Sequence, residues 1–250
     1  MHYGKIISSM NHLENNNKNL NIEFENAYDL SCKDFSHQEL IYMLNNGSIA
    51  QKQIAALKFD YVRTENDAKA ILQNLTGCDG KIREAVALRI NELLLNNLDC
   101  RKFFAQIASN KFADGTIDIN ANICRLVVDS SILLIDFEDF SKPYTDKIIT
   151  FSNQALEELD KFIFRDKKYV INKQLFKLYW CLEALSIFYN YADNKVLEQI
   201  LTKCSEVSEY TIREKTALVC VNSGSFNDIK FKLSNDENYY VRQIITSQMP

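Results

Sequence analysis

Glycine and proline are scarce in this chain, whose 250 residues contain six Gly and two Pro. That share is about a quarter of the share in an average protein. Sandwiches, barrels and propellers need turn residues at intervals of about 8 to 12 residues, and this sequence does not supply them. The scarcity therefore argues against strand-rich folds and favours a chain of helices.

Apolar residues recur at helical spacing almost everywhere from Ser36 onward. Residue types that commonly cap helix N-termini interrupt the pattern at Ser36, Ser48 and Thr64. Thr64 is followed three residues later by Asp67, which resembles a capping box with Asp in place of Glu. The sequence thus predicts short helices of about 10 to 20 residues that are joined by brief polar turns.

The chain also contains an internal repeat. Residues 81–88 align without gaps with residues 211–218, and residues 240–245 follow the same order. Weaker copies lie at residues 51–57, 119–120 and 171–172. We expect a second helix after each copy but the last, over residues 66–75, 100–108, 144–163, 194–204 and 226–233.

One helical hairpin cannot bury both of its apolar faces, whereas stacked hairpins share a continuous core. We therefore expect an all-α fold over residues 34–250, an α-α superhelix (solenoid) of about five helical hairpins plus a final helix. Residues 11–21 contain six Asn, so residues 1–33 are expected to form a polar, partly disordered or irregular segment.

Residues 79–83 and 236–242 resemble the turn and first-helix start of HEAT repeats, in which an acidic residue precedes a Val/Ile-Arg pair. The resemblance covers most of residues 48–250. It implies a HEAT-like solenoid in which recurrent acids and arginines form a structural ladder between repeats. The arginines expected in this ladder are Arg83, Arg213 and Arg242, and the acids expected as their partners are Asp79, Glu209 and Asp236. The family binds many unrelated partners, so the resemblance does not name a function.

Composition narrows the function classes. With 29 Lys+Arg against 33 Asp+Glu, the chain has no broad positive field, which makes nucleic acid an unlikely partner. Its seven cysteines are an odd number without a Cys-x-x-Cys pair, which predicts reduced, buried thiols in a cytoplasmic protein. Apolar patches such as residues 132–135 are far too short to span a membrane.

Catalytic and cofactor chemistry has little support. His2, His12 and His37 form no pair at metal-ligand spacing, so no metal, cofactor or catalytic residue is expected. Residues 77–81 superficially suggest a phosphate loop, but their spacing is wrong and Ile82 follows the Lys. The acidic run of residues 136–140 and the basic run of residues 165–168 are expected to be solvated loops.

One helix is rich in aromatic residues, and two interpretations stay open. Its aromatics include Phe176, Tyr179, Trp180 and Phe188. Trp180 lies four residues from Phe176 and from Ala184, which indicates a packed core face. The alternative is a platform that stacks a nucleic-acid base, as in HEAT-like DNA glycosylases, although the chain has one Trp and an acidic balance.

Partner binding is expected on the second helices of the hairpins, which usually line the concave face of a solenoid. The polar positions predicted there are Lys69, Gln73, Arg101, Lys102, Gln106, Asn153, Glu157, Glu198 and Thr202. They run from basic to acidic along the chain, which suits a protein or peptide partner with uneven charge. We expect a non-catalytic scaffold or adaptor. The alternatives are a nucleic-acid-binding or glycosylase-like protein, and an accessory or lyase-type protein that acts on a pigment protein or enzyme.

Overall fold

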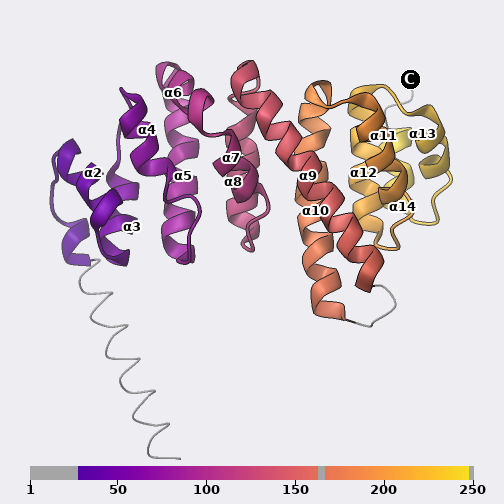
Figure 1. Ribbon diagram of the computed structural model, residues 1–250, viewed down its shortest axis with the longest axis horizontal. Coiled ribbons are helices and arrows are strands. Elements are labelled where there is room, and N and C mark those ends of the chain that lie inside the picture. Colours follow the sequence, from indigo (N-terminus) through magenta and orange to yellow (C-terminus); the bar gives the residue numbers. More distant parts are fainter. Residues whose placement is uncertain (1–27, 163–166, 248–250) are drawn as a thin grey trace, which may run out of the picture.

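The computed structural model describes residues 28–162 and 167–247, and within those ranges it contains helices and no strand (Figure 1). The α-helices are α2 (His37–Asn46), α3 (Ile49–Lys58), α4 (Glu65–Leu72), α5 (Gly80–Asn96), α6 (Arg101–Ile107), α7 (Ser109–Thr116), α8 (Ala121–Ile132), α9 (Glu138–Phe162), α10 (Lys168–Phe188), α11 (Asn194–Cys204), α12 (Tyr210–Ser223), α13 (Asn227–Ser234) and α14 (Tyr239–Thr246). Short 3-10 helices, Leu98–Cys100 and Tyr189–Tyr191, follow α5 and α10.

The helices stack in two layers. Helices α3, α5, α8, α10, α12 and α14 follow one another in the first layer. The second layer contains α2, α4, α6 with α7, α9, α11 and α13, and the hairpins succeed one another along the long axis of the molecule (Figure 1). Buried apolar side chains form one cluster from Leu40 to Ile245. The predicted all-α solenoid of hairpins with a final helix, α14, is therefore confirmed.

The helix starts follow from local sequence. Ser36, Ser48 and Thr64 each cap a helix through a complete capping box. At the third of these, the Asp67 carboxylate accepts the backbone N–H groups of Arg63 and Thr64, both at 2.9 Å. These reciprocal bonds satisfy donors that a helix N-terminus otherwise leaves without a partner.

Two details differ from the sequence prediction. Helix α9 begins at Glu138 rather than at residue 144, so Pro143 lies inside it and the acidic run is partly helical. The helix starts early because Phe140 is fully buried, and because Glu138 and Asp139 favour a helix N-terminus. An additional helix, α7, extends the second layer after α6.

Some predictions fall outside the described residues. Residues 1–27 of the expected polar segment 1–33 lie outside the described residues, and residues 28–31 are helical. Residues 165 and 166 of the basic run 165–168 also lie outside the described residues, and Lys168 is the first residue of α10.

The cysteines are mostly core residues. All seven are free, five of them are buried, and Cys32 and Cys78 are exposed, contrary to the expectation of burial. Burial raises the pKa of Cys100 to about 11 and that of Cys181 to about 12. Such thiols stay protonated at neutral pH and are poor nucleophiles.

Candidate functional site

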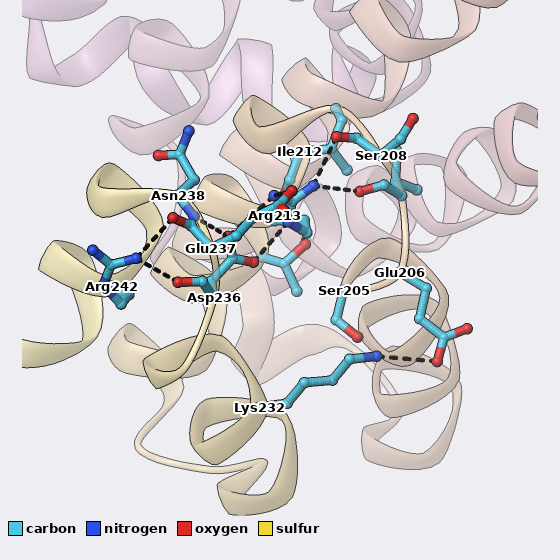
Figure 2. Close-up of polar contacts among 12 residues, drawn as sticks. Ser205, Glu206, Ser208, Ile212, Arg213, Lys232, Asp236, Glu237, Asn238 and Arg242 are labelled. Carbon is cyan, nitrogen blue, oxygen red and sulfur yellow. Dashed lines mark hydrogen bonds and ion pairs between the residues drawn. The ribbon is translucent and has the colours of Figure 1, made fainter.

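Buried arginines tie neighbouring first-layer helices together. Figure 2 shows Arg213, on α12, holding Asp236 before α14 with two bonds: Nε donates to Oδ2 at 2.7 Å and Nη2 to Oδ1 at 3.0 Å. Its Nη1 donates to the carbonyl oxygens of Val207 and Ser208 at 2.9 and 2.7 Å. Arg213 and Asp236 side chains are only 9% and 8% exposed. The guanidinium thus binds its own turn and the next repeat at once.

The same contact recurs earlier in the chain. Arg83, on α5, donates from Nε to Oδ2 of Asp118 at 2.6 Å and from Nη1 to the Gly77 carbonyl at 2.7 Å. Asp118 precedes α8, so the acid again comes from the following repeat. The expectation that Asp79 pairs with Arg83 is wrong, because the Asp79 carboxylate caps α5 by accepting the Ile82 N–H at 3.0 Å.

The other expected ladder residues lie at the ends of these contacts. Arg242 donates from Nη1 to the carbonyl oxygens of Asp236 and Glu237, the second at 2.8 Å (Figure 2). The Glu209 carboxylate makes no bond to the Arg213 guanidinium; it accepts the Thr211 hydroxyl at 3.3 Å. The predicted pairing of Glu209 with Arg213 is therefore wrong, and Asp236 takes that place.

A cysteine interrupts the ladder in the middle of the stack. Cys124 lies four residues after the cap of α8, the position that Arg83 and Arg213 occupy in their helices. Its Sγ donates to the Asp118 carbonyl at 3.1 Å, as the arginines do in their own turns. A thiol has no second donor, so it cannot hold an acid in the next repeat.

The predicted partner-binding residues lie on second-layer helices, except Gln73, which is the C-cap of α4, and several already have intrachain contacts. Lys69 forms an ion pair with Glu65, and Gln73 donates to Asn45. Arg101 donates from Nε to the Leu94 carbonyl at 2.9 Å. The polar groups of Lys69, Gln73 and Arg101 thus already have partners within the chain.

The remaining predicted residues are spread along the same layer. Lys102 and Gln106 are exposed on α6, Glu157 is exposed on α9, and Asn153 on α9 is half-buried. Thr202 and Glu198 are exposed on α11, where the Thr202 hydroxyl donates to the Glu198 carbonyl at 2.8 Å.

The first half of α10 is the least covered part of the first layer. Every residue of 168–177, which we call the α10 ridge, is exposed or half-buried, whereas burial begins at Leu178. The ridge and the end of α9 extend beyond the neighbouring helices (Figure 1). This projection leaves apolar side chains without a neighbouring repeat to cover them.

A cleft lies on each side of the ridge, and Leu175 belongs to both. The aromatic cleft has a volume of 420 Å³ and is lined by Ala121, Asn172, Leu175, Phe176, Tyr179, Trp180, Glu209 and Thr211. The aliphatic cleft has a volume of 480 Å³ and is lined by Leu156, Leu159, Asp160, Ile171, Leu175, Lys203, Glu206, Val207 and Ser208.

The aromatic cleft corrects one prediction from the sequence. Phe188 is a core residue, but Phe176, Tyr179 and Trp180 are half-buried and line the cleft instead of forming a closed core face. The cause is the partner helix: α8 has 12 residues and α10 has 21, so α8 covers only a short part of its neighbour. In the sequence, the density of aromatic residues on α10 is the feature that indicates this cleft.

Metal and membrane features are not found in the described part of the chain. Residues 28–162 and 167–247 contain no group of three or more His, Cys, Asp or Glu side chains that could hold a metal ion. The one histidine there, His37, lies 3.2 Å from Asp67 and stacks on Tyr61. In the same ranges, no helix has the length and apolar character needed to span a bilayer.

The stacked hairpins and the arginine contacts define an all-α helical-repeat solenoid. No family model matches this chain, and no curated protein matches it. It is similar to a solved HEAT-like repeats protein from the archaeon Thermococcus onnurineus NA1, with 13% identity, a TM-score of 0.49, and coverage of 85% of this chain and 78% of that one. It is also similar to an engineered protein, with 10% identity, a TM-score of 0.47, and coverage of 86% and 95%. Both likenesses concern the arrangement of helices alone.

Proposed function

We propose that this chain is a non-catalytic scaffold that binds another protein at the α10 ridge. The observation that carries the proposal is the pair of apolar clefts that flank one projecting helix. Exposed apolar surface of this kind, bordered by polar residues, is typical of protein interaction sites. The aliphatic cleft also includes residues of the second-layer helices α9 and α11, but none of the nine polar residues predicted from the sequence lines either cleft.

The charges at the clefts favour a protein over nucleic acid. The aromatic cleft contains one charged side chain, Glu209, and the aliphatic cleft contains Asp160, Glu206 and Lys203. Lys203 is the only base that lines either cleft, and the ridge lysines Lys168, Lys173 and Lys177 lie outside both linings. A nucleic-acid surface needs positive charge against the phosphates. A reducing compartment such as the cytoplasm belongs to the proposal, because all seven cysteines are free.

Leu175→Lys tests the proposal, because Leu175 lines both clefts. The tagged full chain is used to purify a partner from the native cell, and its Kd is measured. A charge at the centre of an interface should weaken binding at least about 30-fold, as expected for a hot-spot residue. The matched control is Leu95→Lys, which places the same charge at an exposed position on α5 and should leave Kd unchanged.

Thermal unfolding of each variant checks the fold, and Phe176→Ser replaces Leu175→Lys if the latter unfolds. A partner that binds both ridge variants as tightly as the unmodified chain would contradict the surface. Failure to purify any stoichiometric partner would contradict the scaffold role.

A further inference from the structure

The aromatic cleft combines three ring systems with one carboxylate. Trp180 meets Phe176 and Tyr179 edge to face, with ring centroids 6.4 and 5.4 Å apart. Aromatic faces carry negative electrostatic potential and attract cations. Glu209 is the only acidic or basic residue that lines the cleft, and the ridge lysines Lys173 and Lys177 do not line it.

Glu209 is not used by the fold in the way that its position suggests. It stands at the N-cap of α12, but its side chain caps no backbone N–H. Its carboxylate accepts the Thr211 hydroxyl, and it raises the pKa of Arg213 only as a minor contributor behind Asp236. Among the residues that the structure describes, no ion pair to Glu209 is found within 4.0 Å. The carboxylate is therefore open to an external cation.

A neighbouring contact shows what these groups attract. The Lys215 ammonium lies 4.9 Å from the centroid of the Tyr179 ring and pairs with the Glu183 carboxylate. An aromatic face and a carboxylate thus already hold one lysine on this part of α10 and α12. The cleft presents the same combination with Phe176, Trp180 and Glu209.

We propose that the aromatic cleft binds the ammonium or guanidinium group of a lysine or arginine side chain from the partner protein. The apolar stem of that side chain would pack on Leu175 and Phe176, since such stems bury readily while their charged ends stay paired. This inference rests on the proposed scaffold function, because the partner supplies the cation.

The experiment uses the full chain and its single Trp, whose indole N–H gives one side-chain signal in a proton–nitrogen NMR spectrum. Acetyl-lysine amide is titrated in, and its neutral analogue acetyl-norleucine amide is the matched ligand. We expect a saturable shift with the lysine amide and a Kd about 5- to 30-fold weaker for the norleucine amide, the range of cation–π and ion-pair effects in partly desolvated sites.

Two variants separate the carboxylate from the fold. Glu209→Gln should weaken the lysine amide at least about fivefold and leave norleucine binding unchanged. Glu206→Gln removes a carboxylate from the aliphatic cleft instead and should change neither. Three results would overturn the inference. They are equal binding of the two amides, the absence of a saturable shift up to about 100 mM ligand, since so small a ligand is expected to bind with a millimolar Kd, and unchanged lysine-amide binding by the Glu209→Gln variant. Tighter binding of adenosine than of lysine amide would overturn it too and would point to a base-stacking site.

Its failure is distinct from failure of the scaffold function. A chain that loses its partner through Leu175→Lys but ignores lysine amide contradicts only the cation site. A chain that binds lysine amide but yields no partner contradicts only the scaffold.

Discussion

Replacing Arg213 with Leu is expected to lower the free energy of unfolding by about 3 to 5 kcal/mol, the usual cost of removing one partner from a buried ion pair. The substitution leaves the Asp236 carboxylate, which is 8% exposed, without its cation. It also leaves the carbonyl oxygens of Val207 and Ser208 without the Nη1 donor. Urea unfolding monitored by circular dichroism measures the loss.

The matched control is Lys69→Leu, which breaks an ion pair whose side chains are 58% and 44% exposed. Exposed pairs contribute about 0 to 1 kcal/mol, so this variant should unfold almost as the unmodified chain does. If Arg213→Leu costs no more than Lys69→Leu, the arginine contact does not stabilise the stacking of α12 on α14.

The ion pair between Arg213 and Asp236 should also make the stability of the fold depend on pH. Burial tends to raise the pKa of Asp236, but hydrogen bonds from Arg213 and from the Asn238 N–H outweigh it and bring the pKa below 3.8. A depressed pKa means that the carboxylate stabilises the fold above pH 3.8 and that this stability is lost as the pH falls through the lower, folded-state value. Asp236→Asn should therefore be less stable at pH 7 and should lose less of its remaining stability below pH 4. An acid-induced loss equal to that of the unmodified chain would show that other carboxylates dominate.

Helix positions could be predicted because their signals are local. Ser36, Ser48 and Thr64 cap helices through residues three positions away, and apolar spacing marks the buried stripe. The start of α9 could not be predicted from the local acids Glu138 and Asp139 alone. It depends on Phe140 packing on Phe112 of α7 and Phe188 of α10, which are remote in sequence.

The arginine ladder likewise combines a local sequence signal with contacts between residues that are remote in sequence. The arginines could be recognised by their repeated position, but their acids are chosen by the next repeat. Both acids, Asp118 and Asp236, stand two residues before an Asn that caps the following helix. The sequence contains that shared Asp-x-Asn spacing, but the expected partners Asp79 and Glu209 stand before the same helix as their arginine and not in the following repeat.

The aromatic cleft could not be predicted from the sequence for a different reason. Helical spacing correctly assigns Phe176, Tyr179 and Trp180 to the inward side of a helix in a regular stack. Whether that side is covered depends on how far α8 extends along α10, and α8 ends after 12 residues. The short α8, together with a cysteine and not an arginine at position 124, makes the junction between α8 and α10 irregular.

A cluster of buried aromatic side chains packs the helices against one another at this irregular junction. Tyr144 on α9 is fully buried, and its ring lies 5.2 Å from Phe140 and 5.0 Å from Phe188, centroid to centroid. Its hydroxyl lies 2.8 Å from the Thr116 hydroxyl of α7. The cluster thus connects α7, α9 and α10 at the place where the arginine ladder has no contact.

Tyr144→Ala is expected to lower the free energy of unfolding by about 3 to 5 kcal/mol, as large aromatic truncations in a core do. Because each repeat of a solenoid is stabilised mainly by its neighbours, losing this junction should also split unfolding into two steps, one for each side of α9. Tyr144→Phe keeps the ring and should cost about 1 kcal/mol, the net contribution of one hydrogen bond. The Thr116 hydroxyl retains the Phe112 carbonyl as its acceptor at 2.9 Å.

Denaturant unfolding followed by circular dichroism and by Trp180 fluorescence, which reports on the α10 side, distinguishes the outcomes. Coincident transitions for Tyr144→Ala, with a loss no greater than that of Tyr144→Phe, would show that the two sides are coupled through other contacts.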